Sequence, residues 1–121
     1  MIQQTQTAAR ALVRQGDVLL VPVAGVPAGA TPRPRDAGRV ILAYGEVTGH
    51  AHQIAAPDAC GATLLDAPAP EAEADPLAFL VLDAPSALLH EEHAAIPLAA
   101  GAYRVVRQRE YTPERSVYVA D

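Results

Sequence analysis

The stretch GAYRVVRQREY, residues Gly101–Tyr111, carries the clearest strand pattern in the chain. It is rich in valine and tyrosine, which favour extended backbone, and it contains no proline. Side chains alternate between the two faces of a strand, so Tyr103, Val105 and Arg107 share one face. Both faces mix apolar and polar groups. We expect a strand that lines a polar cavity or a subunit interface, or one that covers a sheet with long side chains. Arg107 and Arg109 are the first candidates for binding an anion there.

On both sides of this strand, turn residues recur about every ten positions, and no segment keeps a helical period. Both features favour a small all-β fold, either a barrel or a sandwich. Further strands are predicted at Asp17–Val23, Arg39–Tyr44, Thr63–Asp66, Leu77–Asp83 and Ser116–Ala120, and the short run Ser86–His90 leads into HEEH, with Ser86–Leu89 as a candidate strand that ends there.

A chain of 121 residues has room for one core of ordinary size. We therefore predict a single β domain over residues 15–121. The polar, small residues 1–14 are expected to form a flexible N-terminal arm, with a short helix over Thr7–Arg14 as the alternative.

The charge balance is acidic, with a net charge of −5, and all nine basic residues are arginine. A negative chain is poorly suited to binding nucleic acid, which relies on cationic surface to displace counterions. The single cysteine, Cys60, has no partner for an internal disulfide. The chain also lacks an apolar run of the roughly 20 residues that cross a bilayer, and its start does not resemble a signal peptide. We expect a cytoplasmic protein with no membrane partner.

The four histidines fall in two tight pairs, His50 and His52 in GHAH, and His90 and His93 in HEEH. In an extended chain His50 and His52 point to the same side, ~7 Å apart along the strand. The same alternation places Glu46 on that side, unless a bulge at a nearby glycine shifts the register. This pattern makes Glu46 a conditional third ligand or a base.

HEEH follows a different geometry, because residues three apart lie on one side only in a helical or 3₁₀ turn. If the chain turns there, His90 and His93 both contribute to one site. If the chain stays extended, His90 faces the same way as Glu92, and His93 the same way as Glu91.

Imidazole and carboxylate groups are the ligands that Zn²⁺ and neighbouring transition metals prefer. The sequence therefore predicts a divalent transition-metal site, with Zn²⁺ as the expected ion and Ni, Fe or Mn as alternatives. The simpler interpretation is that the histidines are half-buried hydrogen-bonding residues and that HEEH is a solvated turn. The predicted ligands are His50, His52, His90, His93 and Glu46. No residue is assigned a catalytic role, and the sequence leaves open whether the chain is an enzyme.

Several runs resemble a family of small uncharacterised bacterial proteins: QGDVLLVPV at residues 15–23, GRVILAYGEVTGHAH at 38–52, LLHEEHAAIPLAAGAYRVVRQREYTPE at 88–114 and the terminal VAD. The resemblance covers most of the chain and implies that GEVTGHAH, HEEH and YRVxRQREY belong to one recurring pattern. His50 and His52 also resemble the H-x-H pair of cupins, small barrels that bind a metal with that pair and a later histidine. That resemblance implies a cupin-like barrel.

Three classes of function follow. The first is a metal-binding β domain whose site is built from GHAH and HEEH. The second is a non-enzymatic accessory module that assembles into a homo-oligomer. The third is a nucleic-acid or nucleotide binder, which would need six arginines to gather on one surface: Arg33, Arg35, Arg39, Arg104, Arg107 and Arg109.

Overall fold

The structure, a computed structural model, describes residues 10–45, 49–69, 77–111 and 116–118. Nearly all of its regular structure is β, which confirms the predicted fold class. Among the described residues, one 3₁₀ turn, η1, spans Asp58–Gly61. The strands are β1 (Val13–Gln15), β2 (Val18–Val23), β3 (Thr31–Pro32), β4 (Val40–Tyr44), β5 (Ala51–Ile54), β6 (Ala62–Ala67), β7 (Leu77–Leu82), β8 (Ser86–Leu88), β9 (Ile96–Leu98), β10 (Gly101–Arg107), β11 (Arg109–Tyr111) and β12 (Ser116–Tyr118).

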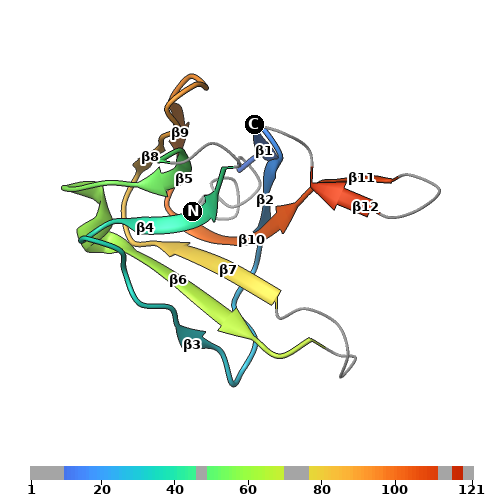
Figure 1. The fold of residues 1–121 in the computed structure, drawn as a ribbon. Coiled ribbons are helices and arrows are strands. Elements are labelled where there is room, and N and C mark those ends of the chain that lie inside the picture. Colours follow the sequence, from blue (N-terminus) through green and yellow to red (C-terminus); the bar gives the residue numbers. More distant parts are fainter. Residues whose placement is uncertain (1–9, 46–48, 70–76, 112–115, 119–121) are drawn as a thin grey trace.

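Six strands form one antiparallel sheet in the order β1-β2-β10-β7-β6-β3. Figure 1 shows β10 between β2 and β7, and its residues pair with both neighbours. The strand at Gly101–Arg107 is therefore central to the sheet. Tyr103 is buried on its inner face, Val105 packs against the core, and Arg104 on the other face is exposed.

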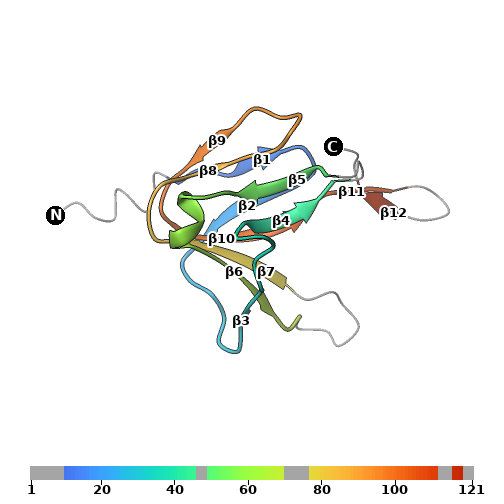
Figure 2. The ribbon, with the colours of Figure 1, turned by 60° about the vertical axis from the view of Figure 1, so that its left-hand side comes forward.

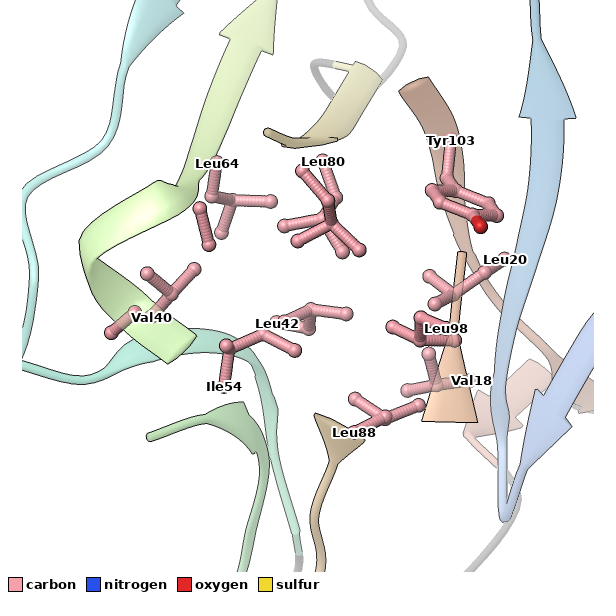
Figure 3. Packing of buried hydrophobic residues seen from close by; sticks show 13 residues of the cluster. Val18, Leu20, Val40, Leu42, Ile54, Leu64, Leu80, Leu88, Leu98 and Tyr103 are labelled. Carbon is pink, nitrogen blue, oxygen red and sulfur yellow. The ribbon is translucent and has the colours of Figure 1, made fainter. Parts of the chain in front are cut away.

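The other strands form the hairpins β4–β5 and β8–β9, which are joined to each other by one bridge between Gln53 and Leu89. Figure 2 shows both hairpins on one side of the molecule, with β6, β7 and β3 on the other, while β11 and β12 extend away from the body. The core lies between these layers, where buried side chains converge (Figure 3). The main sheet contributes Val18, Leu20, Leu64, Leu80, Leu82 and Tyr103, and the hairpins contribute Val40, Leu42, Ile54, Leu88 and Leu98.

The hairpin that carries GHAH has two local features that set its register. A bulge in β4 lies between Ile41 and Ala43, so that Leu42 and Ala43 both contact the core. At the turn, Gly49 has φ of +89°, a left-handed conformation that suits glycine. The Gly45 N–H donates to the carbonyl of His50 at 2.9 Å and closes the turn, so that His50 leads directly into β5.

Two strands end earlier than predicted at points next to the candidate site. The long strand Gly101–Tyr111 is divided at Gln108: its backbone N–H still donates to the carbonyl of Asp17 at 2.7 Å in the register of β2 and β10, but the residues beyond it pair with β12. The candidate strand Ser86–Leu89 ends at Leu88, and bends follow at residues 91–93. The bend after β8 carries His90 and His93 of the candidate site.

Strand β1 begins at Val13, inside the range 1–14 that the sequence assigns to the arm. Arg10 is also held in place, since its guanidinium donates to the carbonyls of Ala102 and Val23 and lies 5.2 Å from the centre of the Tyr103 ring. Residues 1–9 lie outside the described residues, so the arm itself stays a prediction.

Within the described part of the chain, no helix has the length and apolar character needed to span a membrane.

Truncation of a core leucine tests this packing. Leu80 is completely buried on β7, so Leu80→Ala is expected to lower the free energy of unfolding by about 2–5 kcal/mol through lost contacts and a residual cavity. Leu12 is 60% exposed, and Leu12→Ala is expected to change the free energy of unfolding by less than about 0.5 kcal/mol. Urea denaturation of both variants checks the contrast, and equal effects would contradict the described core.

Candidate metal centre

The two histidine motifs lie side by side because of one antiparallel bridge. The backbone N–H groups of Gln53 and Leu89 each donate to the other's carbonyl at 2.9 Å. Stepping away from this pair places His52 opposite His90, then Ala51 opposite Glu91, and His50 opposite Glu92. The register alone therefore brings GHAH and HEEH, nearly forty residues apart in sequence, onto facing segments.

All four histidine rings gather at this junction. The centre of the His90 ring lies 4.4 Å from that of His52, 4.6 Å from that of His93 and 5.6 Å from that of His50. The His52 and His93 rings are nearly parallel, with centres 6.0 Å apart. HEEH thus adopts the bent geometry in which both of its histidines face one site.

Only part of this cluster has ligand atoms close enough together to hold an ion. Among the described residues, these are one atom each from His50, His90 and Glu91, all within 4.8 Å of one another. Ligand atoms on one tetrahedral Zn²⁺ lie roughly 3.4 Å apart, as follows from Zn–N distances near 2.1 Å. Small side-chain rotations would close this difference, because Glu91 is exposed and His50 is partly exposed.

Glu91 is held across the gap between the two segments. Its Oε1 accepts a hydrogen bond from the Ala51 N–H at 2.9 Å, in the position that the register dictates. This bond is the main reason why the pKa of Glu91 lies below its ordinary value, and its own N–H and the nearby His50 and His90 act in the same direction. The carboxylate is therefore ionised near neutral pH.

His52 occupies a different position, completely buried beneath the group of His50, His90 and Glu91. Its Nδ1 lies 2.9 Å from Gln15 Oε1, and its Nε2 lies 3.2 Å from Asp17 Oδ1. Gln15 donates both amide hydrogens elsewhere, to the carbonyls of Leu88 and Ala94 at 3.0 Å, so its oxygen is the acceptor that faces His52. Both ring nitrogens of His52 are therefore directed at oxygen atoms of the protein.

Asp17 connects this network to the main sheet. It is completely buried, and its Oδ2 accepts from the Nε of Arg107 at 2.6 Å. Arg107 also donates to the carbonyl of Tyr44 at 2.8 Å. Arg107, one of the two residues predicted to bind an anion, thus forms an ion pair with Asp17 inside the protein. The side chain of Arg109, the other predicted residue, is not among those the structure describes, so its role stays a prediction.

Gln15 and Asp17 belong to the site although nothing in their local sequence indicates it. A two-residue turn joins β1 to β2, and Gly16 has φ of +58° there, as a tight hairpin requires. Gln15 and Asp17 flank this glycine and point into the protein. A polar pair beside a hairpin turn usually indicates a solvated loop. Their burial depends on β5 and β10, which are distant in the sequence.

The remaining candidates surround the group of His50, His90 and Glu91. The His90 Nδ1 accepts a hydrogen bond from the Glu92 N–H at 3.0 Å, and Glu92 Oε2 lies 3.6 Å from the buried Nδ1 of His50. The Nε2 of His93 is buried without a hydrogen-bond partner among the described residues. Glu46 lies outside them, so its predicted role as a ligand or base stays a prediction.

Several arginines proposed for a cationic surface are engaged with the protein itself. Arg33 donates to the carboxylate of Asp66 at 2.9 Å, Arg35 to the carbonyl of Ala62 at 2.8 Å, and Arg39 to Gln53 Oε1 at 3.3 Å. Their guanidinium groups therefore donate hydrogen bonds to residues of β6 and β5.

Together, the fold and the site define a small antiparallel β domain with a histidine cluster at the junction of two hairpins. The chain belongs to the family described as Domain of unknown function (DUF8820), whose family model matches residues 14–108. That span runs from β1 through the break at Gln108 and includes every described residue of the cluster. No curated protein and no solved structure matches the chain. The resemblance to cupins stays a prediction.

The importance of the buried network beneath the cluster can be measured by removing its charge. Asp17→Asn leaves Arg107 and His52 without their carboxylate, and we expect the free energy of unfolding to fall by about 3–5 kcal/mol. Asp66→Asn removes the same charge from a partly exposed pair with Arg33 and is expected to cost about 0–1 kcal/mol. Urea denaturation distinguishes the two, and a small loss for Asp17→Asn would contradict the network's role.

Proposed function

We propose that this protein binds a divalent transition metal, with Zn²⁺ as the expected ion and Ni, Fe or Mn as alternatives. The observation that carries the proposal is the convergence of His50, His90 and Glu91, whose ligand atoms lie within 4.8 Å of one another. Two imidazoles and one carboxylate are a donor set that suits Zn²⁺ and the other metals of this group.

The surroundings of the three residues support the same proposal. Metal-binding histidines commonly donate their second ring N–H to a carboxylate, and Glu92 Oε2 lies 3.6 Å from His50 Nδ1. The Ala51 N–H similarly orients Glu91. A solvated acidic turn would not need a carboxylate bonded across to the neighbouring strand.

Three protein ligands would leave at least one coordination position for water or another ligand. Glu91 is exposed, so that position would face solvent rather than the core. Such a site is compatible with either a catalytic or a structural role. Homo-oligomerisation and the accessory-module alternative stay predictions beside it.

Removing the carboxylate gives the sharpest test of the ligand set. Glu91→Gln keeps the shape and the acceptor oxygen for Ala51 but loses the charge. We expect Zn²⁺ affinity to fall by more than the ~10–100-fold that loss of an outer partner causes. Competition with a chromophoric chelator measures the affinity of tag-free, metal-stripped protein.

Asp83→Asn serves as the matched control, because it makes the same charge change at an exposed residue after β7. It should bind Zn²⁺ as the wild type does. If the wild type binds none of Zn²⁺, Ni²⁺ and Mn²⁺, the proposed function is wrong. If Glu91→Gln binds as tightly as Asp83→Asn, the assignment of Glu91 is wrong.

Metal binding should also rearrange the HEEH turn. The lone pair of His90 Nδ1 accepts the Glu92 N–H, so in neutral His90 the proton is on Nε2. Coordination through Nδ1 displaces the Glu92 N–H from that nitrogen. Coordination through Nε2 moves the ring proton to Nδ1, where it faces the Glu92 N–H, so that two donors meet and no acceptor remains. Either route breaks the Glu92 bond.

We therefore expect Zn²⁺ to accelerate exchange of the Glu92 amide proton, measured by NMR. The Ala51 amide, which donates to Glu91, provides the internal reference and should keep its protection. An unchanged Glu92 amide in Zn²⁺-saturated protein would exclude His90 as a ligand.

A further inference from the structure

One buried side chain, that of Gln15 at the end of β1, makes hydrogen bonds to both halves of the cluster. It is 2% exposed and belongs to neither histidine motif. Its Oε1 faces His52 Nδ1 in GHAH at 2.9 Å, while its Nε2 donates at 3.0 Å to the carbonyls on either side of HEEH. A primary amide has two N–H donors, and both are used here.

The two carbonyls that Gln15 holds belong to Leu88 and Ala94, so they bracket residues 89–93. Strand β8 ends at Leu88 and β9 begins at Ile96, which leaves the intervening segment outside the ladder of the hairpin. The Gln53–Leu89 bridge fixes one end of this segment, but its far end lies beyond that bridge. The bond to Ala94 fixes the far end.

We infer that Gln15 is the positioning residue of the proposed metal site, setting the separation between His50 on one segment and His90 and Glu91 on the other. The inference rests on the proposed function. It assigns Gln15 no contact with the ion. Gln15 acts through His52, which packs against His90, and through the two carbonyls that hold the HEEH bend.

A purely structural role is the competing interpretation, because any buried amide with three hydrogen bonds stabilises a fold. The two roles differ in their effect on metal affinity. A structural residue changes the population of folded protein, whereas a positioning residue changes the affinity of the protein that is folded. Outer partners of metal ligands typically affect affinity by ~10–100-fold.

The test compares Gln15→Met with Leu64→Ala. Methionine keeps the length of the side chain and removes all three hydrogen bonds. Leu64 is a buried core residue of β6, a strand that contributes nothing to the cluster, so Leu64→Ala destabilises the fold without touching the site. Zn²⁺ affinity is measured by chelator competition at a temperature where circular dichroism shows each variant folded.

We expect Gln15→Met to bind Zn²⁺ ~10–100-fold more weakly than the wild type, and Leu64→Ala to bind it equally well. Saturation with Co²⁺ adds a second readout, since its visible absorption reports the ligand geometry. That spectrum should change in Gln15→Met and stay the same in Leu64→Ala.

If Gln15→Met does not fold, Gln15→Glu replaces it. Glutamate keeps an acceptor for His52 but directs an oxygen, not donors, at the two carbonyls, so the same loss is expected.

Unchanged affinity and an unchanged Co²⁺ spectrum in the Gln15 variant would overturn the inference and leave the proposed function intact. Equal weakening by the Gln15 variant and Leu64→Ala would also overturn it, because the effect would then come from stability. If the wild type itself binds none of the metals, the proposed function fails, and the positioning role fails with it.

Discussion

The reciprocal hydrogen bonds between Gln53 and Leu89 are the interaction on which the rest of the site depends. They are the only bridge recorded between the β4–β5 and β8–β9 hairpins within the described residues. A shift of this pairing by one residue would turn alternate side chains to the opposite face and separate His52 from His90. The same register carries the Ala51–Glu91 bond, so ring contacts and carboxylate placement have one common cause.

Several features of the fold could be predicted from local sequence. Alternating apolar residues located β2, β4, β6 and β7 to within a few residues, and turn residues bounded them. The strand over Gly101–Tyr111 was overextended, because the chain leaves the main sheet after Arg107 and residues Arg109–Tyr111 pair with β12 instead. Local pattern carries no information about such a change of pairing partner.

The candidate site could likewise be predicted only in part from local sequence. The common direction of His50 and His52 follows from strand geometry, and the need for a bend in HEEH follows from the spacing of its histidines. The choice of Glu91 could not be predicted in this way, since its position depends on which residue of β5 lies opposite. Gln15 and Asp17 were missed for a related reason. Polar residues at a hairpin turn are usually solvated, and these two are buried because other strands cover them.

The buried network also bears on how many ligands the proposed site would use. A metal held by all four histidines would need a free nitrogen on His52, whose Nδ1 faces Gln15 and whose Nε2 faces Asp17. Releasing either nitrogen would leave a buried oxygen without its partner, at a cost of about 1–3 kcal/mol or more for a charged group. Binding through His50, His90 and Glu91 avoids that cost and breaks only the Glu92 N–H bond in an exposed turn. The arrangement therefore favours a site with three protein ligands that opens toward solvent, supported from within by His52.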